Sequence, residues 1–285
     1  MKTVSIIVNY NDGKKLTEKI ISTSAVKAID AVIVVDNKSS DGSPETVESM
    51  DKVIVLRAER NGGYGYGNNI GLRYAKDVLN ADYAIISNPD TDIPENCINK
   101  MLSLFSANKD LAVCAPVCMT PDSSFDAPAS AWPIRSWHLE LFEHGPLMRR
   151  IFHRKTHYPA GMFTSYDTVT VDAVLGSCLT ADIGKVLEAG GYDDCVFLYC
   201  EENILGCKLK KHGYKTMLLC SEYYNHDHKP VLPDPEKVRI LRDSELHYFR
   251  NYLEVGSFKI FISRLFFAVV YLETAICKAL CRKNC

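Results

Sequence analysis

The amino-acid sequence predicts an α/β protein with a Rossmann-like, mostly parallel sheet and a helical C-terminal segment. Short apolar segments alternate with helical segments through the first half of the chain. This pattern returns after an irregular middle part, and helical periodicity alone follows from residue 233 onward. Apolar strands that alternate with helices are typical of βαβ units, in which helices cover both faces of a parallel sheet.

The predicted elements follow in order along the first 118 residues. Strands are expected at 4–8, 31–35, 53–56, 83–87 and 111–115, and helices at 14–27, 43–50, 94–108 and from the glycine-rich loop to about residue 77. Pro44 supports the second helix, because the fixed backbone angle of proline suits the first helical position.

The second half is less regular. Residues 120–168 lack clear periodicity and are expected to form a lid or binding loops. Beyond them, we expect strands at 168–175 and 215–219 and helices at 183–189 and 201–211.

The composition narrows the class of protein. The 285 residues allow a substantial core, and 47% hydrophobic with 24% charged residues is ordinary for a globular protein. A net charge of -2 argues against a broad nucleic-acid-binding surface. The 11 cysteines include no C-x-x-C pair, so most are expected to be reduced core residues. The N-terminus does not have the pattern of a signal peptide, which favours a cytoplasmic location.

Polar residues follow each of the first four strands. The four tips are residues 9–12, 36–43, 60–69 and 88–92, all rich in Asp, Asn or Gly. Ligands of open parallel sheets bind beyond the carboxyl ends of the strands. Together the four tips therefore predict a binding site along this edge of the sheet.

The tip at residues 88–92 is a candidate metal site. Asn88-Pro89-Asp90-Thr91-Asp92 presents two carboxylates one residue apart, and hard divalent cations prefer oxygen ligands. An ordinary Asp/Asn/Pro turn is the alternative. His226, expected just past the last strand, is a further candidate ligand for the cation or a phosphate.

Two other tips are suited to a nucleotide. The Asp36 carboxylate can accept the imide N–H of a uracil or thymine ring, although an Asx-turn explains it equally well. In the loop at 62–67, glycines allow close backbone approach, while Arg60, Asn61 and Asn68 supply donors. The loop matches neither a P-loop nor a dinucleotide-binding motif.

Glu201-Glu202 is a candidate catalytic pair at the start of a predicted helix. Acidic residues in a first helical turn are favoured by the helix dipole, so simple capping is one interpretation. A general base that removes a proton from an acceptor is the other.

With these residues, the chain resembles the family 2 glycosyltransferases of GT-A fold, particularly the bacterial rhamnosyltransferase-like branch. The resemblance covers about residues 3–228. Its motifs are Ile-Val-Asn-Tyr-Asn (7–11), Val-Val-Asp-Asn-Lys-Ser-Ser-Asp-Gly-Ser (34–43), Arg-Asn-Gly-Gly-Tyr-Gly-Tyr-Gly-Asn-Asn-Ile-Gly (60–71), Asn-Pro-Asp (88–90), Gly-Gly-Tyr-Asp-Asp (190–194) and Tyr-Cys-Glu-Glu (199–202).

The resemblance implies an inverting glycosyltransferase that uses a nucleoside-diphosphate sugar and Mg or Mn. The donor, a UDP- or dTDP-sugar with rhamnose as one candidate, would contact Asn9, Tyr10, Asp36, Arg60, Asn61, Gly62, Asn68, Asn88 and Asp90. Asp90 would be the principal metal ligand, with Asp92 as an optional second one. The family's base lies in a Glu-Asp pair. Because this chain has Glu201-Glu202 instead, the base remains open between them, with Glu202 at the usual Asp position.

The resemblance also suggests a division of the chain. Residues 1–230 would form the catalytic domain, with a nucleotide-sugar half at about 1–118 and an acceptor half at about 119–230. The acceptor would be a saccharide or a polyprenyl-linked molecule in surface polysaccharide synthesis.

The segment 231–285 has an apolar helical face with basic residues on another arc. The apolar face consists of Phe258, Phe261, Ile262, Leu265, Val269, Leu272 and Ile276. This pattern favours an interfacial helix and peripheral contact with the inner face of the cell membrane. Packing against the catalytic domain, or against a second subunit of a homodimer, is the alternative.

Two other functions compete with this interpretation. A sugar nucleotidyltransferase would need a Gly-rich, basic motif after the first strand, which Asn9-Tyr10-Asn11-Asp12 does not provide. A catalytically impaired nucleotide-sugar-binding partner is supported only by the Glu201-Glu202 departure.

Overall fold

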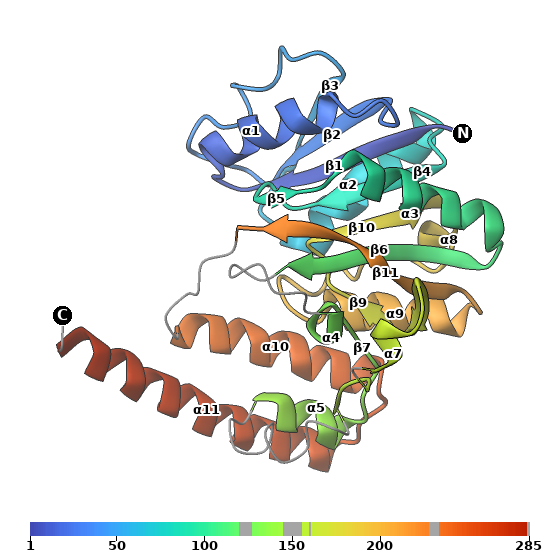
Figure 1. Cartoon of the computed structure of the whole chain (residues 1–285). Helices are drawn as coiled ribbons and strands as arrows, with labels where there is room; N and C mark the ends of the chain where they lie inside the picture. Colours follow the sequence, from blue (N-terminus) through green and yellow to red (C-terminus); the bar gives the residue numbers. More distant parts are fainter. Residues whose placement is uncertain (120–126, 145–155, 160, 228–233, 284–285) are drawn as a thin grey trace.

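The computed structural model describes residues 1–119, 127–144, 156–159, 161–227 and 234–283. A central sheet lies between two layers of helices, and two long C-terminal helices lie beside its lower edge (Figure 1). The order of the main path in the sheet is β3-β2-β1-β4-β10-β6-β11-β5, and β8 also pairs with β11. A small second sheet joins β7 to β9.

The strands are β1 Thr3–Asn9, β2 Ala31–Asp36, β3 Val53–Arg57, β4 Tyr83–Ser87, β5 Thr91–Asp92, β6 Leu111–Met119, β7 Ala131–Trp132, β8 Thr168–Val171, β9 Ala173–Val174, β10 Cys178–Asp182 and β11 Lys215–His226. The helices are α1 Gly13–Ser24, α2 Tyr64–Asp77, α3 Glu95–Ala107, α4 Ala127–Ser130, α5 Trp137–His144, α7 Gly161–Thr164, α8 Ile183–Glu188, α9 Glu201–Lys211, α10 Pro235–Asn251 and α11 Ser257–Lys283.

The predicted mostly parallel sheet is confirmed, with antiparallel additions. β1 pairs in parallel with β2 and β4, β2 pairs in parallel with β3, and β6 pairs in parallel with β11. β10 runs antiparallel between β4 and β6. The strand prediction missed β10, because its short apolar run is stabilised mainly by partners that lie far away in the sequence.

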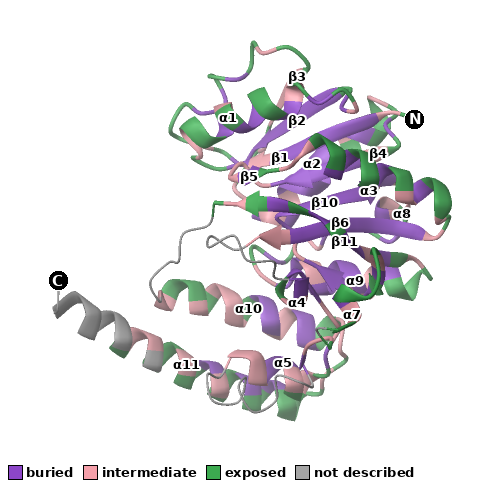
Figure 2. Cartoon of the chain, in the orientation of Figure 1, coloured by how far each residue is buried: buried purple, intermediate pink, exposed green. Residues whose placement is uncertain are grey.

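Successive side chains along a strand point to opposite faces of the sheet, so the strands contribute to the core on both faces. On β1, Ile6 packs toward Leu72 of α2, whereas the neighbouring Ile7 packs in the other layer with Leu16 of α1. The strands β1, β2 and β4 are almost entirely buried, and Figure 2 shows much of the central sheet in purple. Burial on both faces explains why they appear in the sequence as continuous apolar runs.

Two predicted elements differ from the structure: the helix at 43–50 and the end of the last strand. Residues 43–50 form turns instead of a helix, and the Thr46 hydroxyl donates to the Ser43 carbonyl at 2.7 Å. Such side-chain bonds compete with helical backbone bonds. The last strand continues beyond Leu219 through a register shift to His226, so His226 lies within β11 and not past it.

The C-terminal helices pack on the α/β core through a third apolar cluster. It joins α5, α9, α10 and α11 and contains Leu141, Val196, Cys200, Ile204, Tyr248, Phe249, Ile260 and Phe267. The predicted apolar face of α11, from Phe258 to Ile276, lies outside this contact and remains exposed. Among the described residues, no helix combines the length and the apolar character needed to cross a membrane.

Candidate active site

A cavity of about 310 Å³ lies at the carboxyl ends of the central strands, where the sequence predicts binding. β1 contributes Val8 and Tyr10 follows it, while Asn88 to Asp90 follow β4. The remaining lining residues are Asp12, Asn37, Asn61, Gly63, Tyr64, Phe197 and Leu198. Of the predicted nucleotide-sugar contacts, the cavity therefore brings together Tyr10, Asn61, Asn88 and Asp90.

Asp90 is paired with two cationic side chains. His226 Nε2 lies 3.2 Å from Asp90 Oδ1, and Lys15 Nζ lies 3.6 Å from Asp90 Oδ2. Burial alone would raise the pKa of the Asp90 carboxyl, but the hydrogen bond and charge of His226, with the charge of Lys15, lower it overall. Burial opposes protonation of His226 as well, yet the bond to Asp90 and the contact with Cys118 raise the imidazole pKa to about 9.

The pairing of β5 with β11 produces this contact. His226 is opposite Thr91 in the ladder, and Asn225 is opposite Asp92. The two-residue strand β5 thereby places the carboxylate that follows β4 beside the end of β11.

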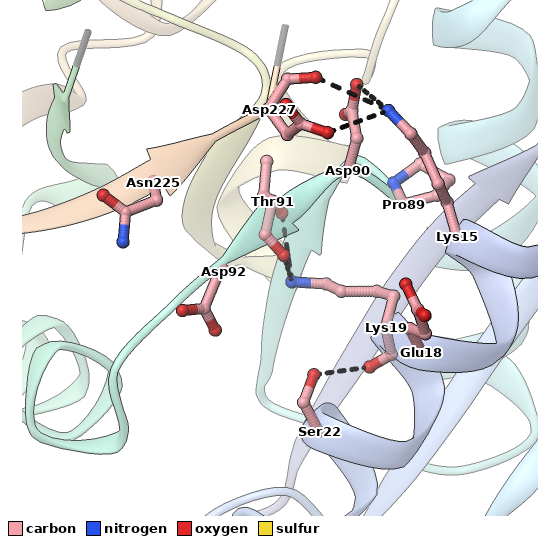
Figure 3. Close-up of a pocket in the computed structure, with 10 residues that line it drawn as sticks. All are labelled: Lys15, Glu18, Lys19, Ser22, Pro89, Asp90, Thr91, Asp92, Asn225 and Asp227. Atoms are coloured by element: carbon pink, nitrogen blue, oxygen red, sulfur yellow. Dashed lines mark hydrogen bonds and ion pairs between the residues drawn. The ribbon is translucent and has the colours of Figure 1, made fainter. Parts of the chain in front are cut away.

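Asp92 lines a second cavity, of about 320 Å³, to which Asp90 and Lys15 also contribute. Figure 3 shows its carboxylate directed away from Asp90. The buried Lys19 ammonium donates to both the carbonyl and the hydroxyl of Thr91 at 3.0 Å. Burial lowers the pKa of Lys19 to about 8. The structure thus places Asp90 and His226 together and leaves Asp92 apart from them.

The donor set around Asp90 fits a divalent cation. One carboxylate and one imidazole converge, and the Asp12 carboxyl is close enough that the Asp90 charge contributes to raising its pKa, after the larger effect of burial. Oxygen and imidazole ligands together suit Mn better than Mg, which prefers oxygen ligands alone.

Asn9 and Asp36 act together beneath the cavity. The Asn9 amide nitrogen donates to Asp36 Oδ1 at 2.9 Å and to the hydroxyls of Ser39 and Ser43. Both residues are buried and neither lines the cavity. In this structure, they hold the tips of β1 and β2 in register.

The glycine-rich loop forms one wall of the cavity. Asn37 donates from its amide to the Gly63 carbonyl at 2.9 Å, and the Tyr64 backbone amide donates to the carbonyl of Phe197 at 3.2 Å. Gly63 has φ +90°, and a Cβ there would lie 1.9 Å from the Phe197 oxygen. Only glycine therefore allows the loop to contact the segment before α9.

The other predicted loop residues have supporting positions. Arg60 lies over the Tyr66 ring at 4.8 Å, and Tyr66 also packs directly against Gly62. Asn68 is fully buried in α2. Arg60, Gly62 and Asn68 were predicted donor contacts, and none of the three lines the cavity.

Glu201 and Glu202 begin α9, immediately after Tyr199 and Cys200, which both have positive φ angles (72° and 66°). Glu202 Oε1 accepts from the Gly176 amide at 3.1 Å, and the Tyr64 hydroxyl donates to the Gly176 carbonyl at 2.6 Å. Burial and then the neighbouring Glu202 charge raise the pKa of Glu201 to about 8. Burial also raises the pKa of Glu202.

Neither Glu201 nor Glu202 lines the cavity, and Glu202 is linked to it only through the backbone groups that it contacts. Its partner Gly176 precedes Ser177, whose carbonyl accepts from the backbone amide of Asn88 at 3.0 Å. Asn88 and Tyr64 both line the cavity.

The prediction missed several lining residues. Asp12 and Asn37 belong to the predicted tips at 9–12 and 36–43 but were not among the predicted contacts, so the sequence did offer a signal for them. Phe197 and Leu198 reach the cavity only because the segment before α9 folds over the glycine-rich loop, and no local pattern indicates that contact.

The fold and this site define the chain as a glycosyltransferase of the GT-A fold. The mannosyltransferase PcManGT of Pyrobaculum calidifontis, solved with GDP-Man and Mn2+, superposes with a TM-score of 0.61 at 14% identity, over 99% of this chain and 75% of that one. GalNAc-T7, solved with UDP, GalNAc and Mn2+, superposes with a TM-score of 0.60 at 17% identity, over 88% of this chain and 49% of that one.

A sequence profile of glycosyl transferase family 2 matches residues 5–169, and the chain belongs to this family. It is 27% identical over 243 residues to the N-acetylglucosaminyl-diphospho-decaprenol L-rhamnosyltransferase of Mycobacterium tuberculosis, covering 81% of this chain and 78% of that protein. It is 25% identical over 197 residues to the low-salt glycan biosynthesis hexosyltransferase Agl10 of Haloferax volcanii, covering 69% of this chain and 58% of that protein. The predicted resemblance to rhamnosyltransferase-like members of the family is thereby confirmed.

Proposed function

We propose that the protein is an inverting, metal-dependent glycosyltransferase that transfers a sugar from a UDP- or dTDP-sugar, with rhamnose as the first candidate. The contact between Asp90 and His226 at the edge of the cavity carries this proposal, because it gathers metal ligands where a diphosphate would lie. The rhamnosyltransferase relative supports the choice of sugar.

The chain's own residues divide the work. Asp90 and His226 would hold Mn or Mg, which when bound would neutralise charge on the departing diphosphate. The wall formed by Tyr10, Asn61 and Gly63 would orient the nucleotide sugar, while Phe197 and Leu198 would restrict the entry of water. Asp36 and Asn9 would shape the pocket for the base from beneath.

Glu202 would remove the proton from the acceptor hydroxyl in a single in-line displacement at the anomeric carbon. Its fixed contact with Gly176, one residue from Ser177 and the cavity-lining Asn88, favours it over Glu201. Burial would raise its proton affinity, and the backbone amides of Glu202 and Gly176 would oppose that rise.

The acceptor is proposed to be a saccharide or a polyprenyl-linked molecule at the inner face of the cell membrane. The helix α11 has an exposed apolar stripe that consists of Phe258, Phe261, Ile262, Leu265, Val269, Leu272 and Ile276. It extends toward the side of the molecule where the arrowheads of β6 and β11 lie (Figure 1). Peripheral contact of this stripe with lipid would bring a membrane-bound acceptor to the open end of the cavity. In this proposal, residues 1–230 form the catalytic domain and 231–285 the membrane-associating segment.

The test uses the purified chain with dTDP-rhamnose or UDP-sugars, Mn and a polyprenyl-diphosphate sugar acceptor. We expect nucleotide diphosphate release that depends on metal and acceptor, and its loss in Asp90→Asn with an unchanged melting temperature. Donor binding without turnover in the wild type would instead support a nucleotide-sugar-binding partner. Absence of donor binding with metal would overturn the proposal.

A further inference from the structure

Outside the cavity, a carboxylate, a thiol and an imidazole converge from two separate parts of the chain. Asp193 and Cys195 lie in the turn between α8 and α9, and His247 lies on α10. One ligand atom of each lies within 4.8 Å of the other two. His247 Nε2 is 2.8 Å from Asp193 Oδ2, although the two residues are 54 positions apart.

Neighbouring groups hold this cluster in place. The Tyr252 hydroxyl donates to Asp193 Oδ2 at 2.6 Å, and the Cys195 backbone amide donates to Asp193 Oδ1 at 2.9 Å. The Asn251 side-chain amide lies 3.1 Å from His247 Nδ1. The hydroxyl and the backbone N–H on the Asp193 carboxylate are outer partners of the kind that orient metal-binding carboxylates.

We propose that Asp193, Cys195 and His247 form a binding site for Zn²⁺ or a similar borderline-soft divalent cation. Oxygen, sulfur and nitrogen ligands in one site are typical of zinc, whereas a thiolate disfavours Mg and Ca. Water would complete a tetrahedral set. Binding releases one proton to solvent, from the Cys195 thiol, and the imidazole of His247 binds in its neutral form, with its proton on the other ring nitrogen.

The burial of the cluster suits such a site. The Asp193 and His247 side chains are 13% and 26% exposed, so they are partly shielded, whereas Cys195 is exposed and leaves a path for the ion. The cluster is separate from the proposed donor site, because none of its three residues lines that cavity.

A bound ion would fasten α10 to the turn at 190–195. That turn is already tied to α2, since the Asn69 side chain bonds both the backbone N–H and the carbonyl of Tyr192, at 2.9 and 3.0 Å. Because α2 begins in the glycine-rich loop, the ion would stabilise the connection between the C-terminal helices and the wall of the cavity. The ion has no direct part in sugar transfer.

The experiment titrates the full chain, stripped with a chelator, with Co²⁺ as a spectroscopic substitute for Zn²⁺. We expect a thiolate-to-cobalt charge-transfer band in the near ultraviolet that one equivalent of Zn²⁺ removes. Zn²⁺ should also raise the melting temperature. Cys195→Ser should abolish the band, and His247→Gln should weaken Co²⁺ binding by about tenfold or more.

Three matched variants serve as controls. Cys207→Ser changes a thiol on α9 and His212→Gln an imidazole that directly follows α9; both lie outside the cluster, and both variants should keep the band. The triple variant Cys277→Ser, Cys281→Ser, Cys285→Ser removes the C-terminal thiols and should keep it as well.

No band at millimolar Co²⁺ in the wild type would overturn the proposal. A band that survives Cys195→Ser, or that disappears in the triple variant, would also overturn it by placing the thiolate elsewhere. Because Cys195 is exposed, Cys195→Ser should melt with the wild type in the absence of metal, and this comparison separates loss of the site from loss of the fold. The readouts do not depend on glycosyl transfer, so they are independent of the proposed function.

Discussion

His226 donates to Asp90 across 136 positions of sequence, with 3.2 Å between Nε2 and Oδ1. The contact exists because β11 continues past its irregular register to meet β5. It unites a motif recognisable in the sequence with a histidine whose position no local pattern determines.

If His226 is a metal ligand, His226→Asn should weaken Mn²⁺ binding by about tenfold or more, because one nitrogen donor is lost. The measurement is Mn²⁺ electron paramagnetic resonance of the free protein, which does not depend on turnover. His212→Asn, which changes an exposed histidine directly after α9 and away from Asp90, should bind Mn²⁺ as the wild type does. Equal Mn²⁺ affinity in the two variants would contradict the assignment.

Glu202→Gln should lower kcat by about 10²- to 10⁴-fold with little change in donor KM, since only the proton transfer is removed. Glu202→Asp keeps a carboxylate and recreates a Glu-Asp pair, so it should retain more activity than Glu202→Gln. Steady-state kinetics with acceptor in excess measures both. Wild-type turnover in both Glu201→Gln and Glu202→Gln would show that the base lies elsewhere.

The raised pKa of Glu201 predicts a dependence of stability on pH. In the folded protein its pKa is about 8, well above that of an exposed glutamate. The folded state therefore binds this proton more tightly. The associated stability is complete below the unfolded pKa and is lost as the pH rises through about 8.

Glu201→Gln, which cannot ionise, should escape that loss. Urea unfolding at a series of pH values should show its free energy of unfolding rising relative to wild type between about pH 5 and pH 8. Parallel curves for the two proteins over this range would exclude a strongly shifted Glu201.

Gly63→Ala should destabilise the protein by at least about 2 kcal/mol, because a positive φ and a clash with the backbone of Phe197 combine there. Gly213→Ala is the matched control: Gly213 has φ +77° but open space around it, so only about 1 kcal/mol of backbone strain is expected. Chemical denaturation compares the two. Equal losses would mean that the loop can move away from Phe197 freely.

The exposed stripe of α11 predicts binding to lipid vesicles. The double variant Phe261→Glu, Leu265→Glu should reduce the bound fraction on anionic phospholipid vesicles by more than about tenfold, since two apolar side chains no longer enter the interface. Ile21→Glu, which replaces an equally exposed side chain on α1, should bind like the wild type.

Vesicle flotation measures the bound fraction, and analytical ultracentrifugation tests the alternative. If the wild type fails to float and is a dimer that the double variant disrupts, the stripe is a subunit interface.

Much of the site followed from local sequence. The four polar tips lie at one edge of the sheet, as the order of strands and helices predicts, and Tyr10, Asn61, Asn88 and Asp90 line one cavity. Helix α9 has the bounds 201–211 that the sequence predicts. These features depend on the periodicity of short segments and on the rule that parallel strands present their carboxyl ends together.

Long-range pairing decided the rest. Asp90 and Asp92 are equivalent in the sequence. In the structure, Asp90 contacts His226 and lines both cavities, whereas Asp92 lines the cavity that contains Lys19. Asn9 and Asp36 appear as exposed tip residues but bond each other beneath the cavity.

By itself, the sequence determined the α/β class, the family and the edge of the sheet that binds the ligand, because apolar periodicity and short motifs are local properties. The tertiary structure alone decided that Asp90 pairs with His226, that Glu202 is held at Gly176, and that Asp193, Cys195 and His247 meet. Each of these three contacts depends on a strand register or a helix packing between distant segments. The free energy that stabilises them comes from the packing of the whole core and not from any one segment.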